Sequence, residues 1–229
     1  MAKIISLEEA VALIPDGASI MFGGFLGCGS AHKIIEALAK KGTKDLTIIG
    51  NDCGMATGPN GEEFYGTAKL VHNHQVKRVI ATHVGMTPDV GTQGMVDKTL
   101  QVDLVPQGSL AEMIRAGGAG LGGVLTPTGV GTIVEDSPLC MGKQTINGRD
   151  YLLMQPVRAD FAIICGHTVD KFGNIWYKGT TRNFNTVMAT AADVVIAEAE
   201  HLVEIGQIEP ENVVTSGAFV NYIVDGGNL

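Results

Sequence analysis

Short hydrophobic runs alternate with amphipathic stretches along the first half of the chain, and these two patterns predict strands and helices in turn. The predicted strands cover residues 18–23, 45–51, 76–85 and 100–108, and the predicted helices cover residues 6–14, 32–42, 61–74 and 109–120. Ser6 followed by Glu9 marks a helix start, and Gly42 marks a helix end. This alternation is typical of an α/β fold, with a doubly wound, mostly parallel open sheet and helices on both faces.

The pattern changes after Gly120, where glycines replace much of the periodic hydrophobicity. The Asn147-Gly148 dipeptide lies between β-rich flanks and predicts a hairpin, because it favours a two-residue hairpin turn. Further strands are predicted over residues 159–167, 173–179 and 192–200. With no internal repeat or low-complexity linker, we expect one domain over residues 1–229, with a β-hairpin excursion at about 132–156.

Composition and net charge limit the kinds of molecule that we expect the chain to bind. A chain of 229 residues that is 45% hydrophobic and 17% charged has the balance of a folded globular protein. Its formal net charge of -8 argues against nucleic acid, because phosphate binding needs a basic face. The widely spaced cysteines form no CxxC pair, which favours reduced thiols; they are Cys28, Cys53, Cys140 and Cys165. With no basic-then-apolar leader and no long apolar run, we expect a cytoplasmic protein without a membrane partner.

The stretch FGGFLGCGSAHKII places four glycines between a predicted strand and a predicted helix. A helix N-terminus offers free N–H groups, and glycines let an anion approach them, although a tight packed turn is the plainer alternative. The order G-G-x-x-G-x-G differs from the dinucleotide fingerprint G-x-G-x-x-G, and no Lys-Ser or Lys-Thr follows as in a Walker loop. The loop therefore points to an anionic ligand without identifying it.

The longer stretch DGASIMFGGFLGCG (residues 16–29) resembles the signature of the family I CoA-transferases in its α-subunit form. Every defining position matches except the final proline, where Ala31 stands. Supporting segments spread over nearly the whole chain: LTIIGND, VKRVIATHVG, LVPQGSLAEMIRAGGAGLGG, LTPTGVGT and GTTRNFN. The resemblance is strongest to the acetate/acetoacetate/butyrate type of 3-oxoacid CoA-transferase. The segment VEDSPLCMGKQ (residues 134–144) departs from it, because the family has a shorter turn there.

The resemblance implies an enzyme that moves CoA from a short-chain acyl-CoA, such as acetoacetyl-CoA or butyryl-CoA, to a carboxylate such as acetate. It implies ping-pong kinetics through a glutamyl-CoA thioester formed on a separate β subunit, within an α2β2 heterotetramer. CoA is then a substrate, and no permanently bound cofactor is expected. The glutamates of this chain lack the expected Glu-x-Gly context: Glu62 and Glu63 are predicted to begin a helix, and Glu135, Glu198 and Glu200 to end strands. We expect half an active site, inactive alone, with exposed apolar surface where the β subunit docks.

By the same resemblance, the residues that contact CoA or the acyl carbonyl form one loop: Gly23, Gly24, Phe25, Leu26, Gly27, Cys28 and Gly29. Asn51 and Gln107 follow predicted strands at the edge where open α/β sheets bind ligands, and their amides are expected to support catalysis. The segments GGAGLGG and TPTGVGT are expected to line the acyl pocket or simply to pack as loops.

Other reactive residues are assigned structural roles. Cys28 lacks a visible base, and His72 and His74 diverge on a helix, so no metal site is expected. His83 and His167 end predicted strands as structural histidines, while Arg115 and Arg182 are interpreted as ion-pairing residues that are able to bind a carboxylate. Two other functions stay open: a self-contained dinucleotide- or sugar-phosphate-binding α/β enzyme, and a non-catalytic binding module.

Overall fold

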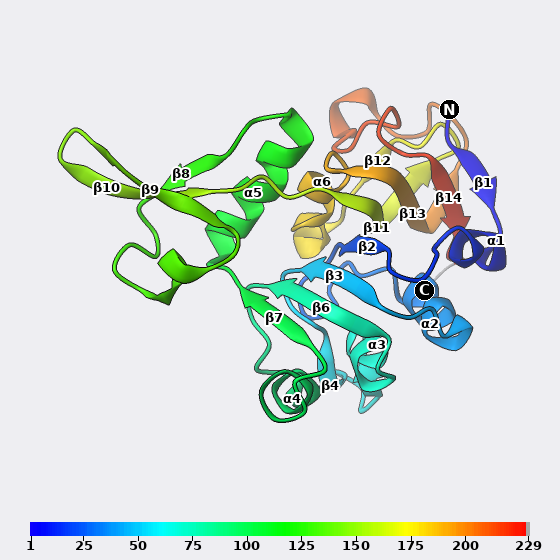
Figure 1. Ribbon diagram of the computed structural model, residues 1–229. Helices are drawn as coiled ribbons and strands as arrows, with labels where there is room; N and C mark the ends of the chain where they lie inside the picture. Colours follow the sequence, from blue (N-terminus) through cyan, green and yellow to red (C-terminus); the bar gives the residue numbers. More distant parts are fainter. Residues whose placement is uncertain (228–229) are drawn as a thin grey trace.

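The computed structural model describes residues 1–227 and contains one large sheet, whose central strands are all parallel (Figure 1). In spatial order the strands are β1 (Lys3–Ile5), β14 (Tyr222–Asp225), β13 (Ala192–Val203), β11 (Ala159–Asp170), β2 (Ser19–Phe22), β3 (Leu46–Gly50), β6 (Val76–Ala81) and β7 (Gln101–Leu104). A short strand, β12 (Ile175–Trp176), pairs antiparallel with β11. The chain order reverses between β2 and β11, which makes this the topological switch point of the sheet.

Helices cover both faces of this sheet, as the sequence predicts. On β2, Ile20 and Phe22 belong to one apolar core and Met21 to the other, because successive side chains of a strand alternate. The first core is closed by α1 (Leu7–Ala12), α2 (His32–Lys41) and α3 (Ala68–His72), and the second by α5 (Gln107–Ala119) and α6 (Asn185–Met188). Short helical turns complete the chain: α4 (Pro88–Gly91), η1 (Thr92–Val96), η2 (Ile133–Asp136), η3 (Gly179–Arg182) and η4 (Pro210–Asn212).

Local sequence signals explain several element boundaries. The Ser6 hydroxyl accepts from the Glu9 amide, and the Glu9 carboxylate accepts from the Ser6 amide, which forms the predicted capping box of α1. Gly42 ends α2 in the left-handed conformation at φ 76°, as predicted.

The predicted hairpin is part of a smaller sheet that projects from the body of the molecule (Figure 1). Its strands are β8 (Val124–Thr126), β9 (Cys140–Ile146) and β10 (Arg149–Met154), in the order β8-β10-β9. Asn147 and Gly148 connect β9 to β10 with φ angles of 52° and 76°, the positive values that a type I′ turn requires. The treatment of the chain as one domain stays a prediction.

Several element boundaries differ from the sequence prediction. The helix predicted over residues 61–74 is wrong in its first half, where β5 (Glu63–Tyr65) pairs with β4 (Met55–Thr57). Phe64 and Gly66 have positive φ values there, and these break a helix before α3 begins. The strand predicted over residues 100–108 ends at Leu104, and Gln107 is the first residue of α5.

The helix predicted over residues 109–120 ends at Gly120, as the sequence predicts. The helix continues through Gly117 and Gly118 to a left-handed Gly120. A Cβ on Gly117 would collide with the backbone of Val157, and one on Gly118 with Thr190, so close packing explains both glycines. No helix within residues 1–227 is long and apolar enough to cross a membrane.

Candidate functional site

The glycine loop lies directly after β2, at the switch point of the sheet. Its tip is a two-residue turn, because the amide of Phe25 donates to the Cys28 carbonyl at 3.0 Å and the reverse bond is 2.9 Å. Leu26 and Gly27 have φ angles of 46° and 82°, as a type I′ turn demands. A leucine rarely adopts this left-handed conformation, so the loop holds local backbone strain at the place where open α/β sheets bind ligands.

The glycines of this loop are required by the packing of the chain itself. A Cβ on Gly23 would overlap the side chain of Asn185, and one on Gly27 would overlap the ring of Tyr65. Gly24 and Gly29 leave similar room for Ser30 and Thr181. A cavity of about 10 Å³ remains beneath the loop, which is the size of one water molecule. Any larger ligand must therefore lie on the outer side of the loop.

The amides of the loop differ in whether they already donate a hydrogen bond. Within residues 1–227, the amides of Gly23, Gly24 and Leu26 donate to other groups of the chain, whereas those of Gly27 and Gly29 have no acceptor. Backbone N–H groups held in a fixed geometry stabilise negative charge on a bound oxygen. Gly27 is buried against the Tyr65 ring and Gly29 is half-buried, so the Gly29 amide is the more accessible of the two.

A chain of hydrogen bonds joins this loop to Asn51 and Gln107. The Gln107 side-chain amide donates to Asn51 Oδ1 at 2.6 Å, and Asn51 Nδ2 donates to Asp52 Oδ2 at 2.9 Å. The same Asp52 oxygen accepts from the Leu26 amide at 2.8 Å, and its other oxygen accepts from the Gly54 amide at 2.8 Å. Asp52 therefore fixes the strained turn, and it links three groups that the sequence analysis singled out separately.

Exposure differs along this chain of hydrogen bonds. Asn51 is 3% exposed and follows β3, whereas Gln107 is exposed at the N-terminal end of α5. A buried amide with both ends bonded has a fixed orientation. Asn51 is thus placed to orient Gln107, whose exposed side chain is the one that can meet a ligand.

A second segment, residues 179–185, also forms hydrogen bonds that hold the loop in place. Asn183 accepts a hydrogen bond from the Gly24 amide and donates to the Cys28 carbonyl, while Asn185 donates to the Gly29 carbonyl. The Asn185 side-chain oxygen also accepts from the Cys165 amide in β11. Sequence reasoning used this GTTRNFN segment only as a family match, and its paired asparagines are the signal that marks it as part of the site.

The N-terminus of α2 is already occupied by a carboxylate of this chain. Glu198 is fully buried in β13, and it accepts hydrogen bonds from the amides of Lys33 at 3.3 Å and Ile34 at 2.9 Å. Burial raises the pKa of Glu198, and the two helix amides partly offset that effect. The free helix N-terminus expected from the sequence is therefore filled, and the loop amides are the donors left for a ligand.

His32, the first residue of α2, supports the loop from below. Its Nε2 lies 2.9 Å from the Gly27 carbonyl, and its ring packs on Tyr65 with centroids 4.4 Å apart. Burial lowers the pKa of His32, which favours a neutral ring that donates to Gly27. His32 thus helps to fix the orientation of the peptide group between Gly27 and Cys28.

The glutamates of this chain are engaged in structural contacts. Glu198 and Glu200 lie inside β13 and not at a strand end as predicted, because the strand continues to Val203. Glu135 lies in η2, also not at a strand end, and accepts from the Gly131 amide. Glu62 lies in a turn, where it bonds Asn60, and Glu63 belongs to β5, so the predicted helix start is wrong.

The other reactive residues have local partners. The exposed Cys28 thiol contacts the Thr180 hydroxyl at 3.2 Å. His72 stacks on Phe64 and lies 2.8 Å from Asp89, while Arg115 pairs with Glu112. His83 is exposed after β6, Arg182 lies in η3, and His74 follows α3. His167 lies within β11 and not at its end, because the strand continues to Asp170.

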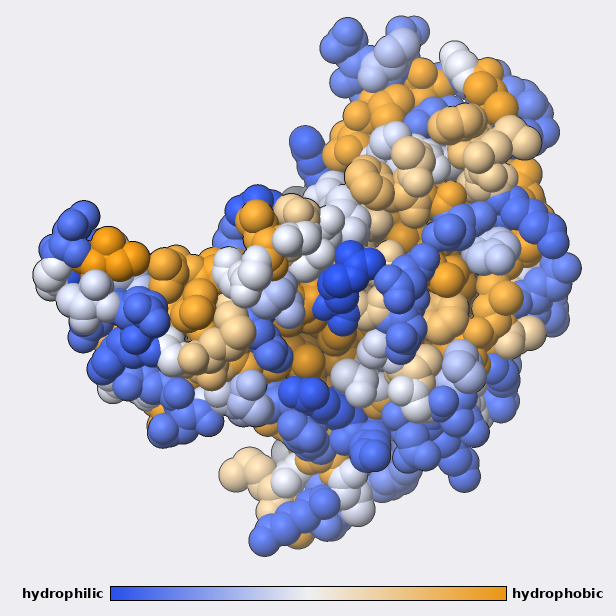
Figure 2. Space-filling view, turned by 45° about the horizontal axis from the view of Figure 1, so that its top comes forward, coloured by the Kyte–Doolittle hydropathy of each residue, from blue (hydrophilic) through white to orange (hydrophobic). Residues whose placement is uncertain are grey.

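A groove of about 640 Å³ lies beside this site, between the ends of β6 and β7 and the segment that precedes β9. It includes Thr82, whose hydroxyl donates to the Asn51 carbonyl, so it begins next to the hydrogen-bonded chain. Around it, Met95, Leu104 and Ile133 are 82%, 51% and 86% exposed. Apolar surface also follows the projecting arm formed by β8, β9 and β10 (Figure 2). Exposed apolar side chains therefore lie next to the candidate site, and others lie elsewhere on the described surface.

Comparison with known proteins identifies the family to which this chain is similar. The family model described as Coenzyme A transferase matches residues 4–226. The chain is 44% identical over 224 residues to "Acetate CoA-transferase subunit alpha" of Escherichia coli (strain K12), covering 97% of this chain and 96% of that protein. It is 48% identical over 223 residues to "Acetoacetyl-CoA:acetate/butyrate CoA transferase alpha subunit" of Clostridium acetobutylicum, covering 97% of each.

Among solved structures, an acyl-CoA transferase of E. coli O157:H7 (YdiF) shares the fold with a TM-score of 0.85 at 23% identity. That match covers 97% of this chain but only 47% of the YdiF chain, so this protein spans about half of that longer polypeptide. The family match extends over nearly all the described residues, including every part of the candidate site. The chain belongs to the coenzyme A transferase family, and its similarity is to the α subunits of that family.

Proposed function

We propose that this chain is the α subunit of a short-chain CoA-transferase and that a separate β subunit completes its active site. The observation that carries the proposal is the strained glycine loop at the switch point of the sheet, with the amides of Gly27 and Gly29 unengaged. Asp52 and Asn51 hold this loop next to Gln107, so donors for an oxyanion and an orienting amide lie together.

The proposed substrates are a short-chain acyl-CoA and a free carboxylate. The similar proteins of E. coli and C. acetobutylicum are named for acetate, acetoacetyl-CoA and butyrate, which supports this substrate class for the present chain. CoA enters as a substrate, and the proposal includes no resident cofactor. The cytoplasm, where thiols stay reduced, is the proposed compartment.

The proposed reaction proceeds by covalent catalysis on the partner. A glutamate carboxylate of the β subunit attacks the thioester carbonyl, CoA leaves as its thiolate, and an acyl-glutamyl anhydride forms. The thiolate then attacks the glutamyl carbonyl, which gives a glutamyl-CoA thioester and releases the first carboxylate. The second carboxylate repeats both steps in reverse, and it leaves as the new acyl-CoA.

This chain contributes to each step without forming a covalent bond. Every attack on a carbonyl develops negative charge on oxygen, and the Gly27 and Gly29 amides are the donors we assign to CoA or to that oxygen. Gln107, oriented by Asn51, is assigned to position the incoming carboxylate or the partner's glutamate.

Two observations support the division between subunits. The glutamates considered as nucleophiles are used in structural contacts, with Glu198 buried against α2 and Glu135 bonded to the Gly131 amide. The apolar groove beside β7 opens directly next to the candidate site, as expected for a surface that a partner covers. We propose an α2β2 heterotetramer as the assembly.

A dinucleotide-binding enzyme is a weaker candidate. In that class an acidic residue after the second strand receives the ribose hydroxyl, and Asp52 occupies the corresponding position. Both carboxylate oxygens of Asp52 already accept hydrogen bonds from this chain, including that of the Leu26 amide, which leaves it poorly placed to receive a ribose.

The proposal is tested by purifying the chain alone and together with a candidate β chain. Each sample is assayed with acetoacetyl-CoA and acetate, and then titrated with a nicotinamide cofactor. We expect turnover only in the mixture and no cofactor binding. Turnover by the isolated chain would contradict the half-site proposal, and tight nicotinamide binding would favour the dinucleotide enzyme.

A further inference from the structure

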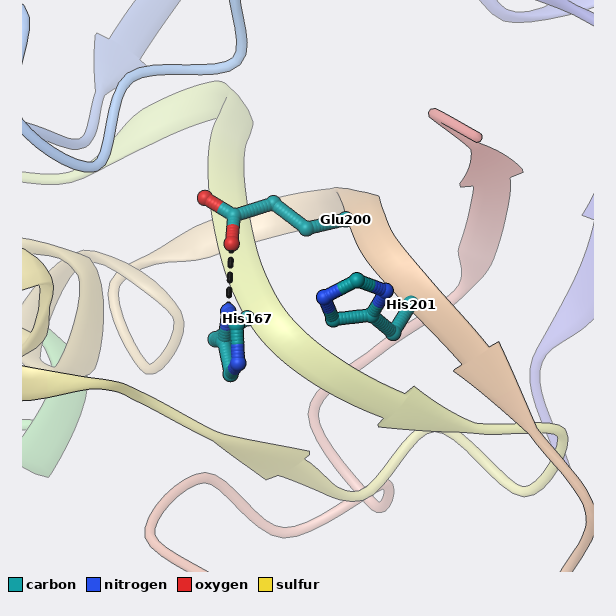
Figure 3. A group of neighbouring side chains, drawn as sticks. All are labelled: His167, Glu200 and His201. Carbon is teal, nitrogen blue, oxygen red and sulfur yellow. Dashed lines mark hydrogen bonds and ion pairs between the residues drawn. The ribbon is translucent and has the colours of Figure 1, made fainter. Parts of the chain in front are cut away.

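A group of metal-ligating side chains lies on β11 and β13, separate from the residues assigned above. His167 comes from β11, and Glu200 and His201 come from β13, its parallel neighbour (Figure 3). The register pairs Thr168 with His201 and Gly166 with Ala199, which places His167 directly beside Glu200. Sequence reasoning missed the group because 33 residues separate His167 from Glu200, and only the pairing of the strands brings them together.

The three side chains converge closely. His167 Nδ1 lies 2.5 Å from Glu200 Oε2, and one ligand atom from each of the three residues lies within 4.8 Å of the other two. The rings of His167 and His201 meet edge to face with centroids 4.7 Å apart, and the three side chains lie near one another (Figure 3). Trp176 of β12 packs edge to face on His167 at 5.2 Å and limits the positions that its ring can take.

This donor set suits a particular class of ion. Two imidazole nitrogens and one carboxylate oxygen match the ligands of Zn²⁺ and related transition metals, whereas Mg²⁺ and Ca²⁺ prefer oxygen alone. Ligands around tetrahedral Zn²⁺, bound at about 2.0–2.1 Å, lie roughly 3.3 Å apart. This spacing falls between the 2.5 Å of the His167–Glu200 contact and the 4.8 Å limit for the three ligand atoms. Three protein ligands leave a fourth position for water or an anion.

Burial also suits an ion that enters from solvent. The side chains of His167 and Glu200 are 17% and 24% exposed, so the group is reachable and yet partly shielded from water. Shielding strengthens the attraction between a carboxylate and a cation. Elsewhere His72 and Asp89 form a similar His–carboxylate pair at 2.8 Å, but it is more exposed, and residues 1–227 supply no third ligand to it.

We infer that His167, Glu200 and His201 form a binding site for a divalent transition metal of the Zn²⁺ class. On binding, the ion takes the place of the hydrogen bond between His167 Nδ1 and Glu200 Oε2. The bound ion bridges two adjacent strands, so it stabilises the pairing of β11 with β13. The site goes beyond the proposed transferase function and shares no residue with the loop, Asn51 or Gln107, so either proposal can fail without the other.

The test is a Zn²⁺ titration of the full chain, without a histidine tag, in competition with a chromophoric chelator. We expect one equivalent of Zn²⁺ per chain and a rise in the melting temperature, with no response to Mg²⁺. His167→Asn, Glu200→Gln and His201→Asn should each weaken binding about tenfold or more. The matched control, His72→Asn, removes a histidine from the other His–carboxylate pair and should bind as the wild type does.

Folding of each variant is verified by circular dichroism, and Co²⁺ absorption of the wild type provides a second readout. A tetrahedral Co²⁺ spectrum that His201→Asn loses and His72→Asn keeps would support the site even where one variant folds poorly. Absence of stoichiometric binding by the wild type would overturn the inference. So would equal binding by all variants, or an equal loss in His72→Asn, since either result means adventitious binding to surface histidines.

Discussion

The glycine loop and the groove beside β7 lie at the same edge of the sheet. Side chains of this chain pack around the loop, whereas they leave apolar residues of the groove exposed. Around the loop, Asp52, Asn183 and Asn185 satisfy backbone groups from both sides, and the glycines are packed against side chains. Around the groove, Leu104 and Ile133 are 51% and 86% exposed. This difference is the one that the proposed function requires, in which this chain preorganises the loop and a partner covers the adjoining wall.

Gly27→Val should have the largest effect, because it disrupts the packing around the loop. The new side chain would overlap the ring of Tyr65, and valine strongly disfavours a φ of 82°. Displacement of the loop should lower kcat/KM of the assembled enzyme about 100-fold or more, with assembly unchanged. Steady-state kinetics and size-exclusion chromatography of the complex measure the two effects.

Gly61→Val is the matched control for this change. Gly61 has a similar φ of 87°, but nothing lies within 4 Å of a Cβ placed there. It reproduces the backbone strain without the collision at the site and should leave kcat/KM within about twofold of the wild type. A near-normal rate for Gly27→Val would refute the role of the loop.

Adding charge to the groove beside β7 should weaken binding of the β chain. Leu104→Asp combined with Ile133→Asp places carboxylates on an apolar surface, and burying them unpaired against a partner is costly. We expect the dissociation constant for the candidate β chain to rise at least about tenfold, with the melting temperature of the isolated chain unchanged. Leu13→Asp, at the end of α1 and 40% exposed, is the control that should bind normally. Unaltered assembly of the double variant would place the interface elsewhere.

Asp52→Asn tests the link between the loop and its support. One carboxylate oxygen becomes an NH2 group, which cannot accept a hydrogen bond. The bond from either the Leu26 amide or the Gly54 amide is therefore lost. A loss of about 1 kcal/mol in loop positioning corresponds to roughly a fivefold to tenfold drop in kcat/KM. Asp45→Asn, an exposed position before β3, should leave kinetics unchanged. Equal kcat/KM values for the two variants would show that Asp52 does not position the loop.

The smallest predicted effect is the pH dependence contributed by Glu198. Its pKa in the folded chain is raised above the unfolded value near 4.5 by burial, so the native state binds more protons than the unfolded state above that pH. The stability it contributes is complete below pH 4.5 and falls as the pH rises through the folded pKa. Relative to wild type, Glu198→Gln should therefore gain stability with rising pH, by at most ~1.4 kcal/mol per pH unit.

Denaturant titrations across this pH range measure the slope. Glu36→Gln is a control of opposite sign, because a hydrogen bond from Lys69 lowers the pKa of Glu36. Relative to that variant, the wild type should lose stability as the pH falls. Parallel curves for wild type and Glu198→Gln would contradict the assigned pKa direction.

Much of the fold follows from the sequence, because its signals are local. Alternating periodicity predicts the parallel sheet, Ser6 and Glu9 predict the start of α1, and Asn147-Gly148 predicts the hairpin. The first half of the helix predicted over residues 61–74 fails because Phe64 adopts a positive φ, which helix propensity does not reveal.

The candidate site was less predictable, because its contacts join distant segments. The sequence indicated the glycine loop, Asn51 and Gln107, but it gave no sign that Asp52 connects them or that Glu198 occupies the N-terminus of α2. Both contacts depend on strand order, since β13 supplies a carboxylate 164 residues from the amide of Ile34. The catalytic roles of the loop, Asn51 and Gln107 stay predictions until the variants are measured.

The central claim, that this chain holds substrate while the partner reacts, is tested most directly by intact-mass spectrometry. The complex is mixed with acetoacetyl-CoA without an acceptor carboxylate, quenched with acid, and its two chains are weighed separately. The account predicts that the β chain gains the mass of CoA less one water and that this chain keeps its mass. A CoA adduct on this chain, with none on its partner, would contradict it.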